Sequence, residues 1–180
     1  YYMANNRMQS YTASTVIQYT NAEAEDGLAP DGTKIDTSEI YGSYIISKVI
    51  QNLEMDPSTA NMDNIRSSIT ITPIITDEQQ QIFDGKVAQG EEASLIATRY
   101  KVTFYSGVEN NKDYPRTMLN EILDVYTAYY GETHVNSSRS ANGVNDIYSK
   151  GYDYIEMMDV IDDSLTTTLA VLDGKVSGDS

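Results

Sequence analysis

One stretch of the chain, SLIATRYKVTFYS at residues 94–106, alternates between two kinds of side chain with a period of two. The alternation places Ile96, Thr98, Tyr100, Val102 and Phe104 on one face, and Ala97, Arg99, Lys101 and Thr103 on the other. This pattern predicts a β-strand whose first face packs on helices and whose second face meets water. Such a strand requires neighbouring strands, and helices that cover one side of the sheet.

Two other segments predict the neighbouring strands. YTASTVIQYT, residues 11–20, is rich in β-branched side chains, and its alternate residues from Tyr11 to Tyr19 share one face. SSITITPII, residues 67–75, places Ile69 and Ile71 on a common face. Proline has no backbone N–H to donate, so Pro73 is expected to end this strand or to lie at the edge of the sheet.

The apolar residues of residues 35–55 recur every fourth position, which predicts an amphipathic helix. Asp36 and Glu39 have the spacing of a capping box at its start. Gly42 costs about 1 kcal/mol relative to alanine in a helix, and we do not expect it to interrupt the pattern. A shorter helix is predicted at residues 61–69.

Residues 113–130 predict a second amphipathic helix, with Pro115 in its first turn and Gly131 as its stop. Its apolar stripe comprises Met118, Leu119, Ile122, Leu123, Val125, Tyr126, Tyr129 and Tyr130. Most of the tyrosines of this segment are therefore expected to pack in a core, because a tyrosine buries its ring while its hydroxyl finds a partner.

Three segments complete the predicted organisation. Residues 77–94 are polar and are interpreted as a long hairpin connection, and residues 136–150 as a polar spacer. Residues 151–173 are predicted to form a longer C-terminal helix. Its candidate helix-pairing or oligomer seam consists of Tyr154, Met158, Ile161, Leu165 and Leu172.

These elements predict one domain over residues 1–180, with a strand–helix base at about residues 8–135. The fold class is α+β (mixed α/β): a small sheet of about three or four strands packed against amphipathic helices, with the longer helix at the C-terminal end.

The charge and the cysteine content exclude several functions. The net charge is −15, which repels phosphate backbones, so no nucleic-acid partner is expected. The absence of cysteine rules out disulfides, thiolate metal sites and a cysteine nucleophile.

No run of apolar residues reaches the roughly 20 needed to cross a bilayer. Because the chain starts at Tyr1, we expect it to be a piece of a longer protein.

No motif of the sequence marks an active site. His134 is the single histidine, so any Ser-His-Asp triad would have to use it; a solvated histidine at a helix C-terminus is the favoured interpretation. Asp31 and Thr33 do not follow the alternation of a calcium loop and predict a turn. No glycine-rich nucleotide loop is present. We therefore predict no catalytic residue, no metal and no cofactor.

The order of the predicted elements resembles the extracytoplasmic domain of the chain-length determinant proteins, or polysaccharide co-polymerases. Three stretches carry this resemblance: YTASTVIQY at residues 11–19, SEIYGSYIISKVIQNLEM at residues 38–55, and ATRYKVTFYSGVENNKDYPRTMLNEILDVYTAYY at residues 97–130. The first resembles the family's strand after the first membrane helix, the second a helix ending in Val-Ile-x-x-Leu, and the third a strand, turn and helix ending in tyrosine.

The resemblance implies a non-enzymatic, membrane-anchored scaffold that regulates chain length in O-antigen or in capsular or exopolysaccharide biosynthesis. It further implies homo-oligomers, a polysaccharide polymerase and its nascent glycan as partners, membrane attachment through segments missing from this chain, and a place in the bacterial cell envelope on the extracytoplasmic side.

Two alternatives to the scaffold stay open. A surface adhesion or glycan-binding module is favoured by exposed tyrosines, which can stack on sugars. A small carbohydrate-active enzyme would need two carboxylates across a cleft; with 27 acidic residues in the chain, some pair always satisfies that spacing, so it ranks last.

Overall fold

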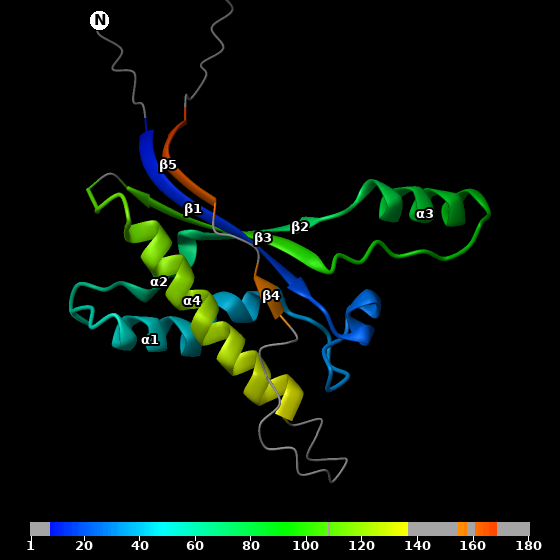
Figure 1. Cartoon of the computed structure of the whole chain (residues 1–180), viewed down its shortest axis with the longest axis horizontal. Coiled ribbons are helices and arrows are strands. Elements are labelled where there is room, and N and C mark those ends of the chain that lie inside the picture. Colours follow the sequence, from blue (N-terminus) through cyan, green and yellow to red (C-terminus); the bar gives the residue numbers. More distant parts are fainter. Residues whose placement is uncertain (1–7, 108, 137–154, 158–160, 169–180) are drawn as a thin grey trace, which may run out of the picture.

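The computed structural model describes residues 8–107, 109–136, 155–157 and 161–168. They form an α+β fold in which a small antiparallel sheet packs against amphipathic helices, as predicted (Figure 1). The strands are β1 (Met8–Tyr19), β2 (Ile69–Ile74), β3 (Arg99–Gly107), β4 (Ile155–Met157) and β5 (Ile161–Thr168). The α-helices are α1 (Ser43–Asn52), α2 (Met62–Ser67), α3 (Asp77–Ala88) and α4 (Tyr114–Tyr130).

The long strand β1 is the centre of the sheet. The strands of the sheet follow the order β2-β3-β1-β4, and β5 also pairs with β1. Each of these pairings is antiparallel. The pairing with β3 joins residues 10–18 to residues 99–107, which are nearly 90 positions away along the chain. The strand β2 pairs with β3 only, and it carries Pro73 at this edge of the sheet, as the sequence predicted.

The predicted C-terminal helix over residues 151–173 is wrong where the structure describes this segment. Residues 155–157 and 161–168 are strands, which pair with opposite ends of β1. Of the predicted seam, Ile161 and Leu165 lie on β5, and Tyr154, Met158 and Leu172 lie outside the described residues. The three consecutive β-branched threonines of β5 favour a strand, and the free edge of β1 supplies backbone partners.

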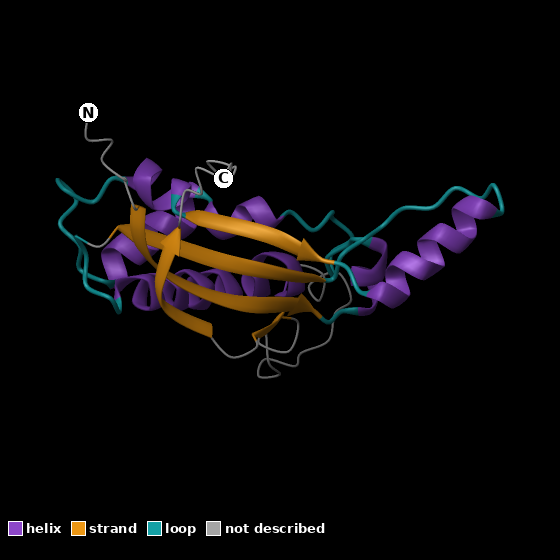
Figure 2. Cartoon of the chain, turned by 90° about the horizontal axis from the view of Figure 1, so that it is seen from above, coloured by secondary structure: helices purple, strands orange, loops and turns teal. Residues whose placement is uncertain are grey.

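The helices α1, α2 and α4 cover one face of the sheet, and the core lies between the two layers (Figure 2). On the predicted face of β1, Ala13, Thr15, Ile17 and Tyr19 are buried, and Tyr11 is half-buried. The predicted stripe of α4 is likewise buried at six of its eight positions: Met118, Leu119, Ile122, Leu123, Tyr126 and Tyr130. On the opposite face of the sheet, Lys101 is exposed, whereas Ser14 and Thr103 are buried and share a hydrogen bond of 2.9 Å.

Gly42 interrupts the helix predicted over residues 35–55. The segment forms a 3-10 turn at Thr37–Tyr41, capped by Asp36, and then α1. Gly42 between them is extended, with φ −60° and ψ 155°. A Cβ at this position would lie 3.1 Å from the carbonyl oxygen of Glu39, so the glycine permits a tight junction between the two helical pieces.

Residues 77–88 form the helix α3, where the sequence predicted only a hairpin connection. Thr76 and Gln79 form a capping box at its start, but none of its residues is buried. Without an apolar stripe, the helix gave no periodic signal, and the capping box was its only local mark. Figures 1 and 2 show α3 projecting beyond the sheet; we call α3 and the return segment 89–98 the arm.

The helix α4 begins with Pro115 in its first turn, as predicted, but Gly131 does not stop it. Gly131 keeps helical angles, and a π-helical turn continues over Gly131–Val135. This extra turn carries the histidine toward the core. Within the described residues, no helix combines the length and the apolar character required to span a bilayer.

Candidate functional site

His134 is buried, with 7% of its surface exposed, and not solvated as the sequence predicted. The prediction of its place at a helix end was right, since it lies in the π-helical turn after α4. The extra turn places the imidazole of His134 against the ring of Tyr130, with the two ring centroids 4.9 Å apart. Nothing in the local sequence distinguishes this buried placement from a frayed, solvated end.

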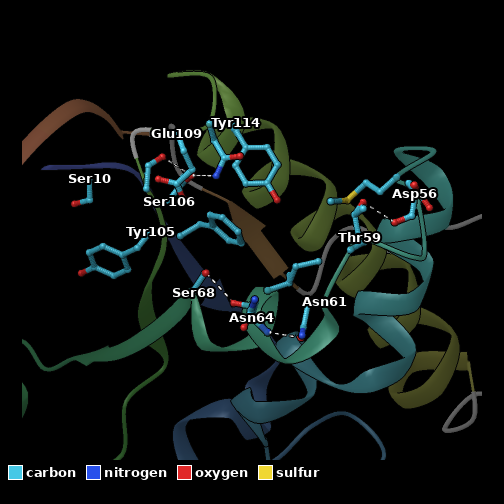
Figure 3. A pocket seen from close by; sticks show the side chains of 16 residues that line it. Ser10, Asp56, Thr59, Asn61, Asn64, Ser68, Tyr105, Ser106, Glu109 and Tyr114 are labelled. Carbon is cyan, nitrogen blue, oxygen red and sulfur yellow. Dashed lines mark hydrogen bonds between the residues drawn. The ribbon is translucent and has the colours of Figure 1, made fainter. Parts of the chain in front are cut away.

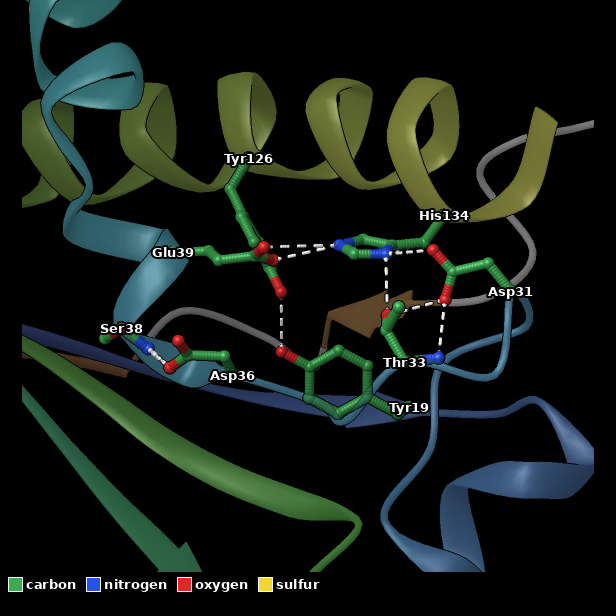
Figure 4. Close-up of polar contacts among 8 residues, drawn as sticks. All are labelled: Tyr19, Asp31, Thr33, Asp36, Ser38, Glu39, Tyr126 and His134. Carbon is green, nitrogen blue, oxygen red and sulfur yellow. Dashed lines mark hydrogen bonds and ion pairs between the residues drawn. The ribbon is translucent and has the colours of Figure 1, made fainter. Parts of the chain in front are cut away.

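Two carboxylates contact the imidazole from opposite sides (Figure 4). Nδ1 lies 2.7 Å from Oδ2 of Asp31, and Nε2 lies 3.1 Å from Oε2 of Glu39. Each ring nitrogen of the imidazole therefore lies within hydrogen-bond distance of a carboxylate oxygen. We call His134, Asp31 and Glu39 the histidine bridge.

Both carboxylates come from the single connection between β1 and α1. Asp31 opens a tight turn in which its Oδ1 accepts hydrogen bonds from the backbone N–H and the hydroxyl of Thr33, at 2.9 and 2.6 Å. Gly32 within this turn has φ +82°. This confirms the turn predicted from the sequence. Glu39 is presented by the 3-10 turn that Asp36 caps.

The surroundings of Asp31 favour its charged form. Burial raises the pKa of this carboxyl, but the hydrogen bonds from Thr33 and His134, together with the imidazole charge, outweigh burial, so the pKa lies below its ordinary value. The histidine bridge thus joins the β1–α1 connection to the end of α4 through an ionised acid.

Three tyrosines lie beneath the histidine bridge. The hydroxyls of Tyr19 on β1 and Tyr126 on α4 are 2.7 Å apart, and the ring of Tyr130 packs against both. Burial raises the pKa of all three phenols above the ordinary value, and the charges of Asp31 and Glu39 add to the effect at Tyr130. These phenols are therefore neutral at physiological pH.

The histidine bridge holds two segments of the fold together. Each ring nitrogen of His134 faces a carboxylate oxygen, and the linings of the two pockets described below include no member of the bridge. Among the residues that the structure describes, no group of three or more histidine or acidic side chains is placed to hold a metal ion.

A second candidate site is an open groove of about 920 Å³ at the end of the sheet (Figure 3). It lies between the end of β3, the β3–α4 connection, the α1–α2 connection and α2. Polar, mostly uncharged side chains and three aromatic rings predominate in its lining, notably Asn61, Asn64, Tyr105, Ser106, Asn110 and Tyr114. We call this cavity the polar groove.

Sequence reasoning did not find the polar groove. Its residues belong to segments such as NMDN and YSGVENN, whose asparagines and serines indicate helix caps and turns. Asn61 does cap α2. Only the pairing of β2 with β3 brings these two distant segments together, and no local pattern predicts that approach. A smaller pocket of about 340 Å³ lies where α3 meets the return segment of the arm.

Comparison of the chain with protein-family models, curated proteins and solved structures gives no match.

Proposed function

We propose that this chain is the extracytoplasmic platform of a membrane-anchored, non-enzymatic scaffold that regulates chain length in surface polysaccharide biosynthesis, of the O-antigen or of the capsular or exopolysaccharide type. One observation carries the proposal: the three stretches that resemble the chain-length determinant family pack as one unit. β1 pairs with β3, α1 packs on α4, and α4 covers both strands.

The buried state of the histidine supports a scaffold over an enzyme. His134 is the single histidine of the chain, and its two nitrogens are engaged in joining two segments of the fold. A hydrolase built on this chain would therefore need catalytic groups other than this histidine, such as the carboxylate pair of a glycosidase.

The arm supports assembly with further copies of the chain. Ile82 and Val87 on α3 are 54% and 52% exposed, and Leu95 on the return segment is 39% exposed. A helix of this length is marginal in water without a packed face, so burial against a second copy would stabilise it.

Deletion of the gene tests the proposal. In the deletion strain, the surface polysaccharide, separated by size on a gel, should lose its preferred length, while its total amount and sugar composition stay unchanged. The full-length gene supplied on a plasmid should restore the preferred length. An unchanged length distribution in the deletion strain would refute the proposal, and a loss of all polysaccharide would indicate an enzyme of synthesis.

The sequence of the full-length gene gives an independent test of the anchoring. The proposal requires a hydrophobic segment of roughly 20 residues on each side of this chain. A complete reading frame without such segments would refute the membrane-anchored part.

A further inference from the structure

We infer that the polar groove binds a short segment of uncharged saccharide. The inference deepens the proposed function, and the origin of the saccharide in the nascent glycan rests on that function. Four features of the groove support the inference: the size, the free hydrogen-bonding groups, the aromatic rings and the charge.

The polar groove has the size and the openness that an extended ligand requires. Its volume of about 920 Å³ lies at the upper end of the range for small-molecule sites, about 300–1,000 Å³. It opens at the surface, and its lining includes residues of the α1–α2 and β3–α4 connections (Figure 3).

The groove presents hydrogen-bonding groups that the protein does not use. Among the described residues, none takes up the side-chain amide of Asn64, the Nδ2 of Asn61 or the hydroxyl of Tyr114. An amide offers two donors and an acceptor, and a phenol offers one of each. A saccharide, whose hydroxyls both donate and accept, matches this mixture better than a ligand with acceptors only.

Two aromatic rings add an apolar surface for the flat face of a sugar. Tyr105 is 44% exposed and lies at one rim of the groove, across from Asp56 and Thr59 (Figure 3). Tyr114 packs edge-to-face on Phe104, with ring centroids 6.0 Å apart, which fixes its position in the groove wall. An exposed ring costs little conformational entropy when it stacks on a ligand, since only two torsions are ordered.

The charge of the groove selects an uncharged ligand. Asp56 and Glu109 line it, and none of the described lining residues is lysine or arginine. A phosphate or a uronic acid would meet two carboxylates and no cation. A sugar hydroxyl, by contrast, donates a short and strong hydrogen bond to a carboxylate.

The direct test is an NMR titration of the whole ¹⁵N-labelled chain. The probes are uncharged tetrasaccharides of glucose, galactose, mannose and N-acetylglucosamine, with tetragalacturonate as the charged control. We expect at least one uncharged probe to shift the amides of residues 59–64 and 105–110 saturably, and tetragalacturonate to shift none. Absence of such shifts with all four probes, shifts confined to another surface, or equal binding of tetragalacturonate would overturn the inference.

Variants locate the binding. Tyr105→Ala and Asn64→Ala should each weaken binding at least tenfold, because each removes a group that contacts the ligand and both side chains are exposed in the free protein. Thr72→Ala, on the exposed edge strand β2 outside the groove, is the matched control and should bind as the unchanged chain does. Binding that survives both groove substitutions would place the saccharide elsewhere.

The inference and the proposed function fail separately. A chain that binds saccharide in the groove while its deletion leaves glycan length unchanged would refute the length-regulating scaffold and keep the groove assignment. A deletion that abolishes the preferred length, together with a groove that binds none of the uncharged probes, would refute the groove assignment alone.

Discussion

At the scale of single residues, tyrosine supplies most of the aromatic side chains of this core, a role that tryptophan and phenylalanine share in other proteins. The chain has 15 tyrosines, two phenylalanines and no tryptophan. A buried tyrosine adds a hydroxyl that needs a partner, and the structure meets this need unequally. The hydroxyls of Tyr19 and Tyr126 share a hydrogen bond, whereas the buried hydroxyl of Tyr130 has no hydrogen-bond partner among the described residues.

This inequality predicts opposite effects of the same substitution. Tyr126→Phe should lower the free energy of unfolding by about 1–3 kcal/mol, because the buried hydroxyl of Tyr19 loses its partner. Tyr130→Phe should leave it unchanged or raise it by up to about 1 kcal/mol, because it removes an unpaired buried hydroxyl. Urea unfolding of both variants measures the difference, and an equal loss in both would contradict the assigned hydrogen bond.

The same tyrosines predict a loss of stability in alkali. Burial raises the pKa of Tyr19, Tyr126 and Tyr130 in the folded chain, whereas in the unfolded chain these phenols ionise near pH 10. Above pH 10 the unfolded state therefore binds fewer protons than the folded state, and the free energy of unfolding falls as the pH rises further. Below pH 10 the three phenols are neutral in both states, so their contribution to the free energy of unfolding is fully present.

Urea unfolding at pH 9, 10 and 11 measures this fall. The double variant with phenylalanine at positions 19 and 126 should show a shallower dependence than the unchanged chain, because two of the three raised groups are gone. Identical slopes for the two proteins would show that these phenols do not titrate differently in the folded state.

The sequence could place His134 at a helix end but could not predict its burial. The deciding facts are that Asp31 and Glu39 point to the same spot from a connection about 100 residues earlier, and that Gly131 continues the helix. Glycine is compatible with both a helix stop and a helical turn, so the residue type alone does not decide.

At the scale of elements, local sequence patterns predicted helices and strands that bury one face against the core, and they missed the helix α3, which buries none. The strands β1, β2 and β3 and the helices α1 and α4 carry period-two or period-four patterns because one face of each is buried. The helix α3 buries no residue, so it has no such pattern. Residues 155–157 and 161–168 belong to a segment with an apparent helical repeat, yet they form strands that pair with β1. Here the tertiary contact with the edge of β1 overrides the local preference.

The capping box predicts how α3 responds to substitution. Thr76→Ala should weaken this helix by about 1 kcal/mol, because the hydroxyl that accepts a hydrogen bond from the backbone N–H of Gln79 is lost. Backbone amides of residues 79–88 should then exchange with solvent about fivefold faster. Global stability should change by less than about 0.5 kcal/mol, because α3 contributes no buried residue to the core.

Hydrogen exchange followed by NMR gives both quantities. Thr72→Ala, an exposed threonine on β2, serves as the control for a surface substitution. A large fall in global stability on Thr76→Ala would mean that the arm belongs to the cooperative core.

At the scale of the whole molecule, the arm is the surface on which the proposed assembly depends. The chain contains no cysteine, so a single introduced cysteine reports on one position. In the purified chain, Val87→Cys on α3 should form a disulfide-linked dimer on mild oxidation. Gln81→Cys, also exposed on the same helix, is the matched control and should form much less. Equal cross-linking at both positions would indicate random collision.

The central proposal is that this chain belongs to a scaffold that sets glycan length, and that His134 joins two segments of the fold without taking part in chemistry. The most direct measurement is the length distribution of the surface polysaccharide in a deletion strain carrying the full-length gene with His134→Asn, at an abundance equal to that of the unchanged protein. Asparagine can still donate to Asp31, so we predict that the preferred length is retained. Loss of the preferred length at equal abundance, with an unchanged NMR spectrum of the purified chain, would contradict the claim.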